Sequence, residues 1–216
     1  MVVKPILDSR SMNKPERRPR ISREQQKALR FEELTNAAWT LFCEKGYESL
    51  TIDEVAEYAG YSRMPIYSLF GDKQNLFFHV WKKISLELMD ILLKGCKEGA
   101  TLNENLRQLA ENLLQDQANK DSHGASIFYV VQSIGISRPD IQEKLRDLAE
   151  IHLQGIKAMI SYSVLEPGQT LRSDPEIIAL NLIAMINGSS TVEFQTRRHF
   201  QDADYLHTLY KAMALN

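Results

Sequence analysis

Apolar residues recur along this chain with the three- or four-residue spacing of amphipathic helices, and no stretch alternates as a half-buried strand does. One such face, formed by Leu34, Ala37, Ala38, Leu41 and Phe42, runs through an otherwise polar segment. Capping residues, prolines and glycines separate the periodic segments. The pattern predicts an all-α protein with helices at about 22–45, 51–59, 62–70, 72–93, 102–118, 123–135, 138–163, 174–199 and 203–214.

The two short helices in this series have the sequence features of a helix-turn-helix. From Thr51 to Phe70 the chain reads TIDEVAEYAGYSRMPIYSLF. Thr51 and Glu54 have the spacing of a capping box. Gly60 can end the first helix, because Gly readily adopts the left-handed backbone just past a helix end, and Ser62 is expected to cap the second. A turn this short sets the helices at a steep angle, so that the second can enter the major groove of DNA.

Charge is distributed unevenly along the chain. Residues 1–83 contain 14 Lys and Arg against 11 Asp and Glu, whereas residues 84–216 contain 12 against 17. The basic excess thus accompanies the helix-turn-helix, where phosphates need neutralising. We expect a disordered basic arm at 1–21, a helix-turn-helix DNA-binding domain at 22–75 and a ligand-binding and dimerisation domain at 76–216. The sequence leaves open whether the arm follows the DNA or is a solvated tail.

Other functional classes have little support in the sequence. No histidine stands in a metal-binding or catalytic motif, and no phosphate-binding glycine loop is present, so we expect neither an enzyme nor a cofactor or metal. Cys43 is expected to be buried, whereas Cys96, flanked by Lys94 and Lys97, is either buried or reactive. No apolar run is long enough to span a membrane and residues 1–20 lack a signal-peptide core, which predicts a cytoplasmic protein.

The N-terminal pattern resembles the DNA-binding domain of the tetracycline-repressor (TetR) family over about residues 28–80. The residues that carry the resemblance are Leu34, Ala37-Ala38, Leu41-Phe42, Gly46-Tyr47, Thr51-Ile52, Val55-Ala56, Ala59-Gly60, Ser62, Ile66-Tyr67, Phe70, Lys73 and Leu76. The resemblance implies a three-helix DNA-binding head, a larger helical domain that binds a small molecule, and a homodimer that is released from double-stranded operator DNA by that molecule.

The candidate DNA-binding residues follow from the same motif. The resemblance implies phosphate contacts by Tyr67, by Lys73 and by the helix that begins at Thr51. Arg63, at the front of the second short helix, is expected to reach a guanine edge or a phosphate. At Met64-Pro65 and Ser68-Leu69 the chain departs from the family pattern, so the base preference of relatives cannot be carried over. The full candidate set is Thr51, Ser62, Arg63, Met64, Pro65, Tyr67, Ser68 and Lys73.

The C-terminal helices supply candidates for a pocket and for a dimer interface. Apolar and aromatic residues with a few polar neighbours suit a largely apolar effector, and the expected lining is Trp81, Met89, Phe128, Tyr129, Gln132, Met159, Tyr162, Asn181 and Met185. The helix at 174–199 is apolar on more than one face, which favours self-association, and the expected interface is Met185, Gly188, Ser189, Val192, Leu206, Leu209, Tyr210 and Met213. A ligand-independent DNA-binding protein or an activator remains the alternative to a repressor.

Overall fold

The computed structural model describes residues 22–119, 123–198 and 201–216, and in this part of the chain every regular element is helical. The helices are α1 Arg23–Ser49, α2 Ile52–Tyr58, α3 Met64–Phe70, α4 Lys73–Leu93, α5 Leu102–Asn119, α6 His123–Ser137, α7 Pro139–Tyr162, α8 Pro175–Thr196 and α9 Ala203–Ala214. The all-α prediction is confirmed, and the predicted segments correspond to these helices. The arm predicted at 1–21 lies outside the described residues.

The boundaries of these helices follow from residues that the sequence displays. Ser22, Thr51 and Asp72 accept hydrogen bonds from backbone N–H groups in the first turns of α1, α2 and α4. Gly46, with a φ of +74°, interrupts the helical backbone near the end of α1, a conformation that Gly adopts at little cost. Pro139 occupies the first turn of α7, where its missing N–H has no helical partner to lose.

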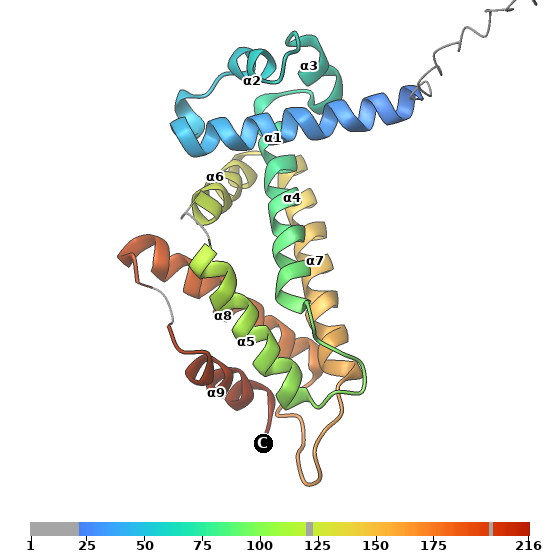
Figure 1. Cartoon of the computed structure of the whole chain (residues 1–216), viewed down its shortest axis with the longest axis vertical. Coiled ribbons are helices and arrows are strands. Elements are labelled where there is room, and N and C mark those ends of the chain that lie inside the picture. Colours follow the sequence, from blue (N-terminus) through green and yellow to red (C-terminus); the bar gives the residue numbers. More distant parts are fainter. Residues whose placement is uncertain (1–21, 120–122, 199–200) are drawn as a thin grey trace, which may run out of the picture.

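The helices form a head above an elongated body (Figure 1). Helix α1 lies across the top with α2 and α3 over it, while α4 and α7 run down from the head side by side, and α5, α8 and α9 make up the lower body. The short helix α6 lies between the head and the lower body, packed against α4 and α7. Helix α4 thus connects the head to the body, since it packs against α1 and α3 as well as against α5, α6 and α7.

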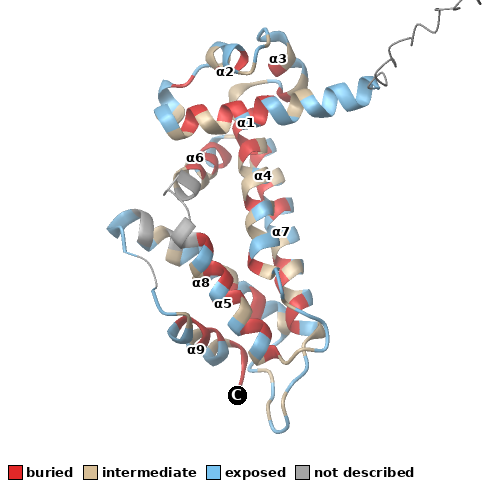
Figure 2. Cartoon of the chain, in the orientation of Figure 1, coloured by how far each residue is buried: buried red, intermediate tan, exposed pale blue. Residues whose placement is uncertain are grey.

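Two hydrophobic cores lie inside this arrangement (Figure 2). The upper core joins Leu34 and Phe42 of α1 to Phe77 of α4, and it also includes Ile127 of α6 and Ile141 of α7. The lower core is built from α5, α7, α8 and α9 with the last turns of α4. The predicted division between residues 75 and 76 falls inside α4, and the upper core lies on both sides of it.

Cys43 and Cys96 are both partly buried, and neither is part of a disulfide. Cys96 donates to the Asn105 carbonyl with an Sγ–O distance of 3.6 Å, and burial raises the pKa of its thiol. Of the two readings of Cys96, the structure therefore supports the buried, unreactive one. Among the described helices, none is both long and apolar enough to cross a membrane.

Candidate nucleic-acid interface and ligand pocket

A complete capping box forms at the start of helix α2. The Glu54 backbone N–H donates to Thr51 Oγ1 at 3.2 Å, and the Thr51 backbone N–H donates to the Glu54 carboxylate at 2.9 Å. Hydrogen bonds from Lys45, at 2.7 Å, and from Thr51 lower the pKa of Glu54 to about 2. Val55 and Ala56 are buried in the upper core, and Gly60 turns the chain with a φ of +75°. These residues define both ends of α2 and the turn that leads to α3.

Helix α3 begins differently from the sequence prediction. Ser62 does not cap it; Arg63 occupies the N-cap position, and no side chain caps the helix. The reason is local, because Pro65 in the first turn has no N–H that needs a partner, and the Arg63 backbone is already in the helical region. The Arg63 carbonyl accepts from the N–H groups of Ile66 and Tyr67. The prediction for Ser62 as a cap was wrong, although Ser62 remains exposed beside the helix.

One face of α3 is buried and the other is open to solvent. Ile66 and Phe70 are buried in the upper core, whereas Arg63, Met64 and Tyr67 are exposed. Ser68 is also exposed, and its hydroxyl donates to the Pro65 carbonyl at 3.1 Å. The exposed face carries a single formal charge, that of Arg63 at its start. The structure therefore gathers Ser62, Arg63, Met64, Pro65, Tyr67 and Ser68 on or beside one projecting helix.

Thr51 caps α2 and Lys73 opens α4, and the head already uses both side chains. The Thr51 hydroxyl donates to the Glu54 carboxylate at 2.9 Å. Lys73 Nζ donates to the Tyr47 carbonyl at 2.6 Å and stands 4.2 Å from the centre of the Tyr47 ring, and burial lowers the pKa of this ammonium. Because an ammonium has three donors, the contact with Tyr47 leaves Lys73 able to bind a phosphate as well.

A polar junction that sequence reasoning missed ties α7 to the first residues of α4. Arg138, at the corner between α6 and α7, donates to Asp72 Oδ2 at 3.1 Å and to Gln74 Oε1 at 2.5 Å. Lys144 Nζ donates to Asn75 Oδ1 at 2.7 Å. Burial opposes ionisation of Asp72, but its hydrogen bonds with Asn75 and Arg138 leave its pKa below the usual value. These hydrogen bonds attach α7 and the α6–α7 corner to the first turn of α4, which follows α3 in the chain.

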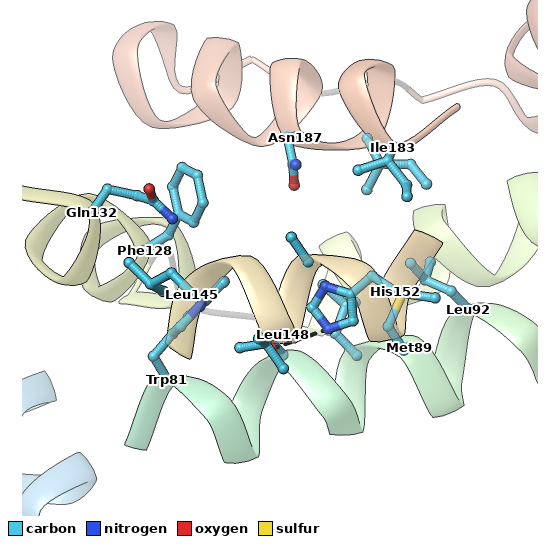
Figure 3. Close-up of a pocket in the computed structure, with 14 residues that line it drawn as sticks. Trp81, Met89, Leu92, Phe128, Gln132, Leu145, Leu148, His152, Ile183 and Asn187 are labelled. Atoms are coloured by element: carbon cyan, nitrogen blue, oxygen red, sulfur yellow. Dashed lines mark hydrogen bonds between the residues drawn. The ribbon is translucent and has the colours of Figure 1, made fainter. Parts of the chain in front are cut away.

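A cavity of about 220 Å³ lies in the body between α4, α6, α7 and α8 (Figure 3). Its lining includes four of the predicted ligand-binding residues, Trp81, Met89, Phe128 and Gln132. The sequence analysis missed ten others, which are Ser85, Leu88, Leu92, Leu145, Leu148, Ala149, His152, Ile183, Ile186 and Asn187. A hydrophobic residue at helical spacing gives no sign of which cavity it borders, so sequence reasoning had no signal for most of these positions.

The other five predicted pocket residues lie elsewhere. Met159 is fully buried in the lower core, and Tyr162 and Met185 pack against that core. Asn181 is exposed on α8, and the ring of Tyr129 lies against Phe128 with their centroids 5.4 Å apart. None of the five borders the cavity between α4, α6, α7 and α8.

The polar side chains of the pocket are uncharged or weakly basic. Ser85 Oγ and His152 Nε2 are 3.3 Å apart, and burial lowers the pKa of His152 below its usual value. The amides of Gln132 and Asn187 reach the cavity from α6 and α8. Trp81 and Phe128 form an aromatic pair, with ring centroids 5.3 Å apart, at the α6 end.

The predicted dimer residues separate into two groups. Leu206 and Tyr210 are fully buried inside the subunit's own lower core, so in this structure they cannot contact a partner, and including them in the interface was wrong. Their place on an amphipathic helix did not reveal which face the subunit uses. Gly188 and Val192 are exposed on α8, and Met185, Ser189, Leu209 and Met213 are partly buried. The exposed face of α8 also includes Ile177, Leu180 and Ala184.

Comparisons with known proteins agree with the architecture. Residues 34–80 match the family model described as bacterial regulatory proteins, tetR family. Over 89 residues the chain is 32% identical to the HTH-type transcriptional repressor BdcR of Escherichia coli (strain K12), an alignment that covers 39% of this chain and 45% of BdcR. The chain therefore aligns with less than half of the length of that curated relative.

Solved structures extend the likeness to the fold of the body. A protein from Mesorhizobium loti MAFF303099 assigned to the same family superposes with a TM-score of 0.68 at 21% identity, covering 87% of this chain and 94% of that one. A regulator from Saccharomonospora viridis, solved in complex with choline, gives a TM-score of 0.66 at 18% identity over 88% of this chain and 99% of its own. These relatives are transcriptional regulators and not enzymes.

Proposed function

We propose that this chain is a dimeric repressor, which a small effector releases from its operator DNA. It belongs to the TetR family of bacterial regulatory proteins, whose model matches residues 34–80. The observation that carries the proposal is the pairing of two features in one molecule. First, an exposed recognition helix, α3, projects from the head. Second, a cavity in the body is lined in part by α4, the helix that follows α3 in the chain.

The DNA-binding role rests on the solvent-facing side of α3. In helix-turn-helix proteins the second helix lies in the major groove with its first residues at the base edges. Arg63 stands at that end and can form a bidentate contact with a guanine. Met64 and Pro65 offer apolar surface to thymine methyl groups, while Tyr67, Thr51 and Lys73 serve as phosphate contacts.

The dimer rests on the exposed face of α8. Ile177, Leu180 and Val192 are each about half exposed and lie along one side of that helix, with Ala184 and Gly188 between them. Small residues let two helices approach closely, and the apolar neighbours would then be buried at the contact. Two copies joined here would present two heads to one pseudo-palindromic site.

The first test is DNA binding itself. The full-length protein is expected to prefer a pseudo-palindromic genomic duplex, with half-sites about 34–36 Å apart if they are one turn apart. The affinity should fall steeply as salt rises, because bound phosphates release counterions. Genomic footprinting followed by titration at two salt concentrations measures both properties. Equal affinity for the footprinted site and for random DNA would contradict the proposal.

The recognition helix can be tested by separating base contacts from phosphate contacts. Arg63→Ala is expected to change the preferred base at one position in each half-site, at a cost of about 1–3 kcal/mol. Tyr67→Phe is the matched comparison, because loss of a phosphate contact should weaken binding to all sequences alike. Binding-site selection from a random library checks both variants. An unchanged motif for Arg63→Ala would remove Arg63 from base reading.

A further inference from the structure

The cavity in the body combines an uncharged lining with hydrogen-bonding groups that are not in use. Among the described lining residues none is an Asp, Glu, Lys or Arg, and His152 is the single titratable group. A charged ligand held against this lining would have no opposite charge beside it, and moving a charge out of water without a partner is costly. The lining therefore disfavours carboxylates, phosphates and ammonium compounds.

Two amides in the cavity have free hydrogen-bonding capacity. Gln132 is partly buried and Asn187 is exposed, and within the described ranges neither side chain has a hydrogen-bond partner in the protein. Figure 3 shows Asn187 pointing from α8 across the gap toward α7, and Gln132 beside Phe128 on α6. An amide both donates and accepts, so each can bind a ligand hydroxyl or carbonyl oxygen. The Ser85–His152 pair, in contrast, already has its own hydrogen bond, 3.3 Å long.

The size and the walls of the cavity limit the rest of the ligand. A dry apolar cavity of about 150 Å³ binds benzene, so a cavity of 220 Å³ suits a compound with on the order of ten non-hydrogen atoms. Trp81 and Phe128 present an aromatic wall, and the remaining lining is mostly Leu, Ile and Met. A single aromatic ring with short substituents matches this space.

We propose that the effector of this protein is a small uncharged aromatic compound whose hydroxyl or carbonyl oxygen is bound by the amides of Gln132 and Asn187. This inference rests on the proposed function in that the cavity is taken to be the effector site. It goes further by specifying the charge, size and polar group of the effector, and by assigning a recognition role to two named residues.

A set of four probes on one frame tests the chemistry without DNA. The probes are 4-ethylphenol, 4-ethyltoluene, 4-ethylbenzoate and 4-ethylbenzylammonium, titrated calorimetrically into the full-length protein at neutral pH. We expect 4-ethylphenol to bind about 2- to 12-fold more tightly than 4-ethyltoluene, which is the range for one net hydrogen bond. Both ions should bind more weakly than 4-ethyltoluene. An ion that matches or exceeds 4-ethylphenol, or no binding of 4-ethylphenol at millimolar concentration, would overturn the proposal.

Two variants assign the hydrogen bond to its residues. Gln132→Leu and Asn187→Ala should reduce the 4-ethylphenol affinity, at least one of them by about 2- to 12-fold, and leave the 4-ethyltoluene affinity unchanged. Asn181→Ala is the control, because Asn181 lies on the same helix as Asn187 but outside the cavity lining. If neither variant lowers the 4-ethylphenol affinity more than the 4-ethyltoluene affinity, the two amides do not hydrogen-bond to the ligand. Operator binding is measured separately on the same proteins, so failure here would leave the regulator function standing.

Discussion

A glutamate in place of Leu180 is expected to separate the dimer and to reduce operator affinity by about 10²- to 10⁴-fold. The side chain of Leu180 is on the exposed face of α8, with half of its surface open in the single subunit. A glutamate there would place like charges opposite each other at the contact between two copies. A single subunit can bind only one half-site. It therefore loses the increase in affinity that comes from binding two linked half-sites at once, which is about 10²- to 10⁴-fold.

The control for this variant is a glutamate on an apolar position of equal exposure outside the proposed interface. Ile151 on α7 is 52% exposed, against 50% for Leu180, so Ile151→Glu changes a similar surface without touching α8. Sedimentation measures the mass of each variant in solution, and titration of operator DNA measures the affinity. A Leu180→Glu protein that remains dimeric and binds operator as the original chain does would place the interface elsewhere.

Loss of Arg138 is expected to uncouple effector binding from DNA binding. Coupling of this kind usually changes affinity by about 5- to 150-fold, and because it is reciprocal, operator should weaken effector binding by the same factor. Arg138 links the α6–α7 corner to Asp72 and Gln74 at the start of α4. In Arg138→Ala the DNA-binding and effector sites both remain, but the factor by which operator changes the effector affinity should fall toward one.

The measurement is calorimetry of effector binding with and without saturating operator. Arg146→Ala serves as the control, because Arg146 is an exposed residue on the same helix, α7, away from this junction. The Arg138 guanidinium binds Asp140 through Nε and Nη2 while Nη1 binds Asp72 and Gln74. Arg138→Lys keeps the charge but has one nitrogen for all of these contacts, so it should restore only part of the coupling. Full coupling in Arg138→Ala would show that the signal reaches the head by another route, such as the packing of α6 against α4.

Local signals in the sequence accounted for most of the fold, and spatial relationships were the part that they could not supply. The capping box at Thr51 and the cap at Asp72 depend on residues three apart, so they can be read directly from the chain. The Ser62 prediction failed because a proline two positions into the next helix removed the need for a cap. Contacts between distant segments left no local trace, as with His152 and Ser85, which lie 67 residues apart.

The same distinction explains the errors at the two ends of the body. An amphipathic pattern correctly predicted α9 as a helix with one apolar face. That face, which includes Leu206 and Tyr210, is buried inside the subunit and is not available to a partner. In the pocket, Trp81 and Phe128 were found because large aromatic side chains are few, whereas Leu145 and Ile183 have the same appearance as any core residue. Which apolar residues border a void depends on how helices pack, and periodicity carries no information about it.

The upper core has a practical consequence for dividing this protein into parts. Phe77 packs its ring against Tyr47 at 4.9 Å and Phe42 at 5.7 Å, and Ile127 and Val131 of α6 belong to the same cluster. A fragment cut after residue 75 would remove Leu76, Phe77 and Val80 from the upper core and expose Phe42, whose ring packs against Phe77. A chimera that exchanges recognition specificity with a relative should therefore transplant only α2 and α3, and keep α1, α4 and α6 from one parent.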